Sequence, residues 1–255
     1  MIQGSVSIVG AGPGDPELLT IKAMRRIQSA DVILYDRLVS EEILSYGKPE
    51  ALRIYVGKAP GHHSMPQEAI EQLIIKYASA GNHVVRLKGG DPYVFGRGGE
   101  EALAVAAAGI DYEVIPGITS AIGAAASAGI PLTHRGLAAS FAIVTGSRCH
   151  DQASAAHWEG LVHSVDTLVI YMGVSTLTDI RQQLLKCGKN PATPAALIEN
   201  GTTSRERTVT GTLGNMDKLA AALKISNPAL IIIGESVAVR DQLLGLQKGV
   251  RSQIG

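Results

Sequence analysis

Two glycine-rich segments that also carry charged residues are the parts of this sequence best suited to chemistry. The first, 10–16, reads Gly-Ala-Gly-Pro-Gly-Asp-Pro and follows an apolar run. A glycine-rich turn between a strand and a helix suits a phosphate-bearing cofactor. Asp15, however, occupies the place of the third glycine in the dinucleotide-binding pattern, and Pro13 lacks an N–H donor. We therefore do not expect NAD. The alternative is a tight turn in which Asp15 caps a helix that begins at Pro16.

The second segment, 86–101, contains Gly89, Gly90 and three further glycines, so a ligand can lie directly against its backbone. Asp91 is a natural partner there for a ribose hydroxyl or an ammonium group, and the alternative is a structural loop that Asp91 caps. Thr119 and Ser120 follow Pro116-Gly117. Their hydroxyls either face a ligand cleft or cap the next helix.

Cations gather in two stretches that lack acidic residues, although the net charge is zero. These stretches lie between Glu50 and Glu68 and between Glu113 and Asp151, and they contain Arg53, Lys58, His62, His63, His134, Arg135, Arg148 and His150. Such clustering indicates a local site for a polyanion, and arginine suits forked recognition of carboxylates. The alternative is chance clustering on solvated loops. Neither the adjacent histidines nor the two cysteines have metal-ligand spacing, so we expect no metal.

Short β-branched runs alternate with helical patterns, which predicts an α/β fold. The predicted strands are 5–9, 32–35, 53–56, 83–88, 112–115, 141–145, 167–171, 195–198 and 229–234. The predicted helices are 17–29, 66–80, 99–108, 118–128, 176–185 and 215–223. We expect two α/β domains, 1–117 and 118–255, each on a largely parallel sheet, with the active site in the cleft between them. Residues 207–210 are the candidate for an antiparallel strand.

Composition excludes several classes of protein. Apolar residues make up 45% and charged residues 18%, which argues against disorder. A net charge of zero argues against nucleic-acid and membrane-surface binding. The longest apolar stretch, 167–174, is too short to span a bilayer, and a predicted strand begins close to Met1 where a signal peptide would lie. We therefore expect a cytoplasmic protein.

Taken together, the motifs resemble those of the tetrapyrrole (corrin and porphyrin) methylases, the class III S-adenosylmethionine-dependent methyltransferases. Segment 9–16 is similar to the opening motif of that family. Segments 34–40, 56–58 and 89–101 resemble the branch that C-methylates uroporphyrinogen III. Further similar segments are 116–121, 129–136, 171–173, 199–202 and 228–230. The resemblance covers residues 4–240. It departs at Ser147, where many members carry histidine, so Ser147 receives no role.

This resemblance implies that S-adenosylmethionine is bound and leaves as S-adenosylhomocysteine. The implied cofactor contacts are Pro13, Gly89, Gly90, Asp91, Val94, Thr119, Ser120, Met172, Gly201 and Ala229. The family pattern makes Asp36 the proton acceptor and Lys58 the proton donor. Both follow predicted strands, at the edge where open α/β sheets place their sites. Arg97 is expected to handle the carboxylate-rich substrate, with Glu100 orienting its guanidinium.

The implied reaction is C-methylation of uroporphyrinogen III at two pyrrole carbons, giving precorrin-2 for siroheme, cobalamin or haem d1 biosynthesis. Relatives also suggest a homodimer. Two alternatives stay open at this point. The same fold can methylate another acceptor, such as a later precorrin or the diphthamide precursor, although 97–101 favours uroporphyrinogen III. The chain can also be a non-enzymatic tetrapyrrole or nucleotide binding module.

Overall fold

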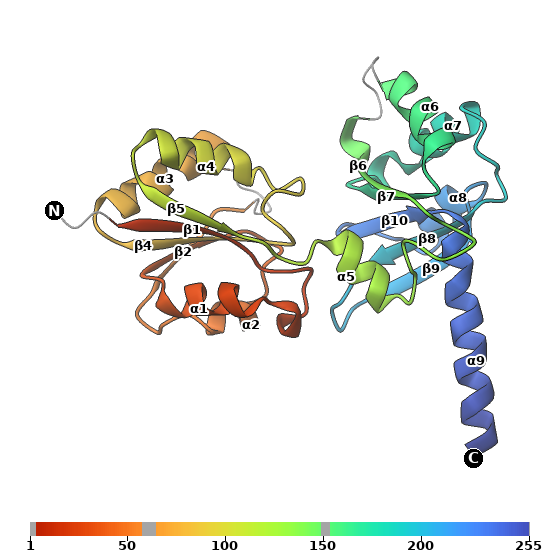
Figure 1. The fold of residues 1–255 in the computed structure, drawn as a ribbon, viewed down its shortest axis with the longest axis horizontal. Helices are drawn as coiled ribbons and strands as arrows, with labels where there is room; N and C mark the ends of the chain where they lie inside the picture. The colour runs from red at the N-terminus through yellow and green to blue at the C-terminus, as the bar shows by residue number, and fades with distance from the viewer. Residues whose placement is uncertain (1–3, 58–64, 149–153, 255) are drawn as a thin grey trace. The chain divides into compact units, whose positions relative to one another are not determined.

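The computed structural model describes residues 4–57, 65–148 and 154–254. The chain divides into two compact units, Met1–Thr119 and Ser120–Gly255 (Figure 1). Each unit consists of a five-stranded sheet with helices packed on it. The predicted α/β class is therefore confirmed.

The sheet of unit 1 is parallel throughout, in the order β3-β2-β4-β1-β5. Its strands are β1 (Ser5–Gly10), β2 (Val32–Tyr35), β3 (Leu52–Tyr55), β4 (His83–Lys88) and β5 (Asp111–Ile115). The central strands β1, β2 and β4 are buried along most of their length. Because helices cover both faces of a parallel sheet, such strands consist of nearly continuous apolar runs. All five carboxyl ends lie along one edge, called here the carboxyl edge.

Helices cover both faces of this sheet (Figure 1). On one face lie α1 (Ile21–Ser29) and α2 (Glu41–Ser45), which pack on Val9, Val85 and Leu87. The other face carries α3 (Gln67–Ser79) and α4 (Gly98–Ala107). A short 3₁₀ helix, η1 (Pro16–Leu18), precedes α1. The two helix layers exclude water from the sheet, so the hydrophobic effect stabilises this unit from both sides.

The second sheet has the order β6-β7-β10-β8-β9. Its strands are β6 (Phe141–Thr145), β7 (Thr167–Tyr171), β8 (Pro194–Glu199), β9 (Arg207–Thr212) and β10 (Ala229–Ile233). Among these described strands β6 and β7 pair in parallel, while β10 is antiparallel to β7 and β8, and β8 is antiparallel to β9. The prediction of a largely parallel second sheet was wrong, because a buried apolar run reads alike in either direction. The prediction of an antiparallel strand at 207–210 is confirmed.

The helices of unit 2 also lie on both faces of its sheet. On one face α6 (Ser154–Ser164), α7 (Leu177–Lys186) and α8 (Met216–Ala222) cover an apolar core, and on the other lies α5 (Ser120–Ser127). Three short 3₁₀ helices are η2 (Gly146–Arg148), η3 (Val174–Thr176) and η4 (Glu235–Ala238), and the chain continues into α9 (Val239–Ile254). Helices α2, α6 and α9 were not predicted from the sequence. The sequence signal for α6 was the helical spacing of its apolar residues Trp158, Leu161 and Val162, which pack into the core.

Candidate active site

Three loops meet backbone to backbone at the carboxyl edge of unit 1. The N–H of Gly12 donates to the carbonyl of Gly90 at 3.2 Å, and the N–H of Gly90 donates back at 2.7 Å. Both residues have positive φ, +76° and +68°. A Cβ on Gly117 would lie 2.2 Å from the Gly90 oxygen and 2.8 Å from the Gly10 Cα. Only glycine allows this approach, so the edge presents backbone rather than side chains.

Asp91 ties two of these loops together. Its Oδ1 accepts from the Tyr93 N–H at 2.8 Å, and its Oδ2 accepts from the Gly117 N–H at 3.1 Å. Asp91 therefore has a structural role in the loop, and its role towards a ligand stays a prediction. Each carboxylate oxygen keeps a second lone pair for a ligand. The first glycine-rich loop also has its predicted cap, because Asp15 accepts from the Glu17 N–H at 2.9 Å and Pro16 starts η1.

Asp36 follows β2 at the same edge, beside a charged side chain that comes from β4. Its Oδ1 accepts from the Leu38 N–H at 3.0 Å. Its Oδ2 lies 3.7 Å from Nη2 of Arg86, a residue whose side chain is 5% exposed. The Asp36 side chain is 26% exposed and remains accessible. A carboxylate in this position can accept a proton from a bound molecule.

Sequence reasoning missed the charged residues behind Asp36. Glu101 in α4 is fully buried, and its Oε1 accepts from Arg86 Nε at 3.0 Å and from Lys88 Nζ at 2.9 Å. Burial, and next the charge of Arg86, lower the pKa of Lys88, while Glu101 opposes the shift. The sequence signal for this cluster was the spacing of Arg86 and Lys88 in a largely apolar strand. Residues two apart in a strand point to the same face, so both cations lie on one buried face.

Arg97 and Glu100 form a forked ion pair at the start of α4. Arg97 Nε lies 2.9 Å from Oε1 of Glu100, and Nη2 lies 2.5 Å from Oε2. Both side chains are more than half exposed. The hydrogen bond with Arg97 holds the pKa of Glu100 below its usual range. The guanidinium is thus oriented by its i+3 neighbour and remains open to solvent.

A second edge gathers three of the expected cofactor contacts in unit 2, Met172, Gly201 and Ala229. Ala229 starts β10 opposite Glu199 of β8, and Ile231 lies opposite Ile170 of β7. Antiparallel pairing therefore brings the start of β10 to the ends of β7 and β8, where Met172 and Gly201 follow.

Helix α5, which begins at Ser120, lies beside the same edge. A Cβ on Gly201 would lie 2.4 Å from the Cβ of Ala124, and the Ala121 N–H donates to the Tyr171 hydroxyl at 2.7 Å. Met172 has a left-handed φ of 53° and is 47% exposed. Met172, Gly201 and Ala229 carry no charge, which suits an uncharged ligand surface.

The remaining expected site residues fall into two groups. Pro13, Gly89 and Val94 lie in the loops of the carboxyl edge, where the Val94 N–H donates to the Asp91 carbonyl at 3.3 Å, and Thr119 ends unit 1. Lys58, His62, His63 and His150 lie outside the described residues. Within the described part of the chain, no cluster of three or more histidine, cysteine or acidic residues is arranged to hold a metal.

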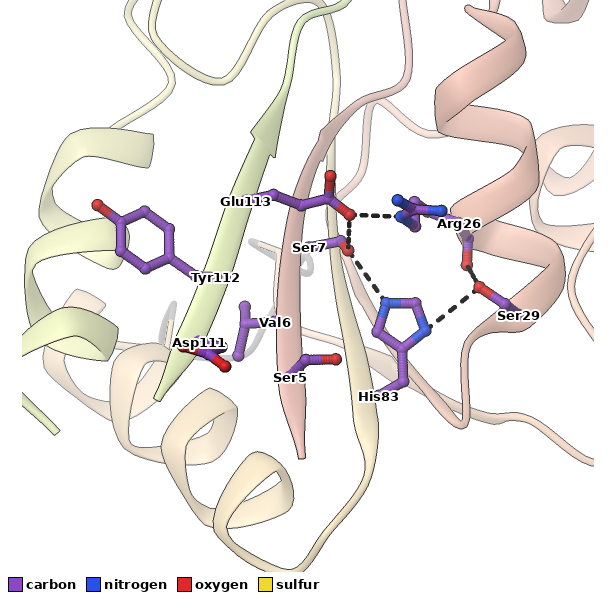
Figure 2. A pocket seen from close by; sticks show the side chains of 9 residues that line it. All are labelled: Ser5, Val6, Ser7, Arg26, Ser29, His83, Asp111, Tyr112 and Glu113. Carbon is purple, nitrogen blue, oxygen red and sulfur yellow. Dashed lines mark hydrogen bonds and ion pairs between the residues drawn. The ribbon is translucent and has the colours of Figure 1, made fainter. Parts of the chain in front are cut away.

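A polar hollow of about 440 Å³ lies at the opposite edge of the unit 1 sheet (Figure 2). Glu113 binds Arg26 there, lies 2.7 Å from Lys22 Nζ and accepts from the Ser7 hydroxyl at 3.1 Å. Ser7 also lies 3.0 Å from Nε2 of His83. The hydrogen bond from Arg26, with those from Lys22 and Ser7, lowers the pKa of Glu113 to about 2 against the effect of burial. These side chains bind one another, so we assign the hollow a structural role.

We expect Glu113→Gln to lower stability at neutral pH. The pKa falls from 4.5 to about 2 on folding, so the ionised carboxylate stabilises the fold above pH 4.5, and this stability is lost as pH falls towards 2. The side chain is 31% exposed, and after allowance for screening we expect a loss of about 1–2 kcal/mol. Denaturant unfolding from pH 7 to pH 2 checks this. An equal difference at pH 7 and pH 2 would contradict the assignment.

Comparison with known proteins identifies the family. The family model for tetrapyrrole (corrin/porphyrin) methylases matches residues 5–217. The chain belongs to this family. Among the residues that the structure describes, no helix is long and apolar enough to cross a membrane.

Individual tetrapyrrole methylases match over most of the chain. The uroporphyrinogen-III C-methyltransferase of Priestia megaterium is 55% identical over 92% of this chain and 98% of its own length. Siroheme synthase 2 of Aeromonas hydrophila is 52% identical over 96% of this chain, which spans about half (52%) of that longer protein. The crystal structure of the Thermus thermophilus uroporphyrin-III C-methyltransferase complexed with S-adenosylhomocysteine has a TM-score of 0.78 and 43% identity, over 92% of this chain and all of that one.

Proposed function

We propose that this chain is a uroporphyrinogen-III C-methyltransferase that makes precorrin-2 by two S-adenosylmethionine-dependent methylations. The observation that carries the proposal is 55% identity to a protein of that name across 92% of this chain. The match also extends over 98% of the relative's length. The product would serve siroheme, cobalamin or haem d1 biosynthesis.

The two edges fit the proposed cofactor. The backbone edge at Gly12 and Gly90, with lone pairs left on Asp91, suits the hydroxyls and ammonium group of S-adenosylmethionine. The unit 2 edge at Met172, Gly201 and Ala229 suits an adenine. We propose Pro13, Gly89, Val94, Thr119 and Ser120 as further contacts. A relative's structure holds S-adenosylhomocysteine, which supports this choice of cofactor.

The proposed chemistry assigns separate tasks to the chain's side chains. The sulfonium of S-adenosylmethionine supplies an electrophilic methyl group, which an electron-rich pyrrole carbon attacks as the C–S bond breaks. Positioning of the substrate then supplies most of the acceleration. The alkylated ring must lose a proton, and we propose Asp36 as the acceptor, because its side chain remains 26% exposed at the carboxyl edge. Lys58 is proposed as the proton donor on the family resemblance.

A direct assay tests the function. The purified chain is incubated with uroporphyrinogen III and S-adenosylmethionine carrying a labelled methyl group, and the tetrapyrrole is analysed by mass spectrometry. We expect two labelled methyl groups per ring. Methylation of a later precorrin but not of uroporphyrinogen III would move the chain to another branch of the family. Binding of S-adenosylhomocysteine with no methyl transfer to any tetrapyrrole would support the binding-module alternative.

We expect Arg97→Lys to lower turnover at least tenfold, a loss of about 1.4 kcal/mol of transition-state stabilisation. Lysine keeps the charge but not the fork that matches a substrate carboxylate. Affinity for S-adenosylhomocysteine, measured by calorimetry, should change little. Arg181→Lys is the control, because Arg181 pairs with Asp217 in unit 2 at 3.0 Å. Near-normal turnover in Arg97→Lys would contradict a role in substrate binding. Arg97 and Glu100 would then form only a surface ion pair that contributes about 0–1 kcal/mol to stability.

We further propose that catalysis needs no metal and that the chain acts as a cytoplasmic homodimer. A sulfonium leaving group does not require a Lewis acid, since the C–S bond breaks to a neutral thioether. We expect thorough chelation to leave turnover unchanged. Activity lost on chelation and restored by one metal ion would refute this. Light scattering of the purified chain measures the assembly state.

A further inference from the structure

A buried cluster of charged side chains lies beneath α4, at the carboxyl end of β4. Arg86 and Lys88 both donate to the Oε1 of Glu101, and Gln67 Nε2 donates to the same oxygen at 3.3 Å. The other oxygen, Oε2, is buried and has no hydrogen-bond partner among the described residues. Two cations therefore share one buried carboxylate, which leaves a local surplus of positive charge.

Asp36 is the carboxylate that this surplus attracts. The distance of 3.7 Å from its Oδ2 to Arg86 Nη2 is that of an ion pair and exceeds a hydrogen bond. Arg86 thus lies beside Asp36 without occupying a lone pair of Oδ2. The N–H of Leu38 holds the other oxygen. A fixed orientation and one oxygen without a hydrogen bond suit a proton acceptor.

Arg86 cannot easily turn away from this position. Its Nε is anchored on Glu101, and its Nη1 donates to the carbonyls of Leu87 at 2.9 Å and Leu34 at 3.4 Å. Because the guanidinium is planar, these contacts determine where Nη2 points. Leu34 lies in β2, two residues before Asp36, so the same side chain also ties the two strands together.

We propose that Arg86, anchored by Glu101, is a positioning residue that holds Asp36 in place as the proton acceptor. The inference rests on the proposed function. Stability alone does not explain the cluster, since well-packed apolar residues often replace a buried ion network at no cost. Among the residues that the structure describes, the charges that face Asp36 are Arg86 and Lys88, both from β4, while Glu101 from α4 acts through Arg86.

The test is Arg86→Lys, with turnover measured across pH under saturating cofactor. Lysine keeps a positive charge beside Glu101 but has no second nitrogen that reaches Asp36. We expect turnover to fall about tenfold or more, and the acidic limb of the pH profile to move to higher pH. Affinity for S-adenosylhomocysteine should stay within about twofold, and its binding stoichiometry corrects for any unfolded fraction.

The chain offers a matched control at the other edge of the same sheet. Glu101 and Glu113 each bind one arginine and one lysine, at opposite edges. Glu101→Gln loosens the anchor of Arg86 and should lower turnover, whereas Glu113→Gln should lose stability and keep the wild-type turnover and pH profile. If Glu101→Gln fails to fold, Arg86→Lys still decides.

Three outcomes would overturn the proposal. A wild-type profile and turnover in Arg86→Lys would remove Arg86 from the mechanism and leave the proposed function intact. A drop in turnover at all pH values, with no movement of the acidic limb, would give Arg86 a structural role only. Failure of the wild-type chain to methylate uroporphyrinogen III in the same assay would overturn the proposed function, and the positioning role with it.

Discussion

Asp36→Asn should lower turnover at least about 100-fold, the usual range for loss of a general base. Asparagine keeps an oxygen for the Leu38 N–H, which the aspartate accepts at 3.0 Å. It loses the negative charge beside Arg86 and cannot take up the proton. The methyl-transfer rate should therefore fall, while the affinity for S-adenosylhomocysteine stays close to that of the wild type.

Asp31→Asn is the matched control, because Asp31 and Asp36 flank the same short strand, β2. Asp31 lies at the opposite edge, where it pairs with Lys48 at 3.0 Å and accepts from the His83 N–H at 2.9 Å. Its replacement should lower stability without changing turnover per folded molecule. Equal losses of turnover in the two variants would show that the general-base role does not belong to Asp36.

Gly117→Ala should destabilise unit 1 by about 2–3 kcal/mol and weaken S-adenosylhomocysteine binding at least tenfold. The new methyl group would lie 2.2 Å from the Gly90 oxygen. The obstacle is backbone, which has no rotamer to change, so the loops at Gly10, Gly90 and Gly117 must separate. Their separation also breaks the hydrogen bond from the Gly117 N–H to Asp91.

Gly160→Ala provides the control for this substitution. Gly160 lies inside α6, and a Cβ there would meet no atom within 4 Å. Alanine should raise stability by about 0.5–1 kcal/mol, because it restricts the unfolded chain and favours the helix. Thermal unfolding and calorimetry of both variants check the pair. Wild-type cofactor affinity in Gly117→Ala would contradict the cofactor role proposed for the carboxyl edge.

Features that depend on neighbours in sequence were determined by the sequence itself. The bounds predicted for β2, β4, β6 and β7 are confirmed, because each is a short, largely apolar run with turn or polar residues on either side. Asp15 caps the N–H of Glu17, only two residues further along the chain. Arg97 and Glu100 form an ion pair because three residues separate them, about one helical turn. Such contacts follow from local geometry, whatever the rest of the chain does.

Features that depend on which elements become neighbours were decided by the tertiary structure. The mostly antiparallel second sheet was not predicted, since alternation and burial carry no information on strand direction. Asp91 was recognised, but its hydrogen bond to Gly117 requires two loops to meet at one edge. Glu101 reaches Arg86 and Lys88 only because α4 packs over β4. Burial under that helix removes water from these three charges and strengthens their interactions. Charged residues that are unremarkable in the sequence thereby form a cluster that can hold Asp36.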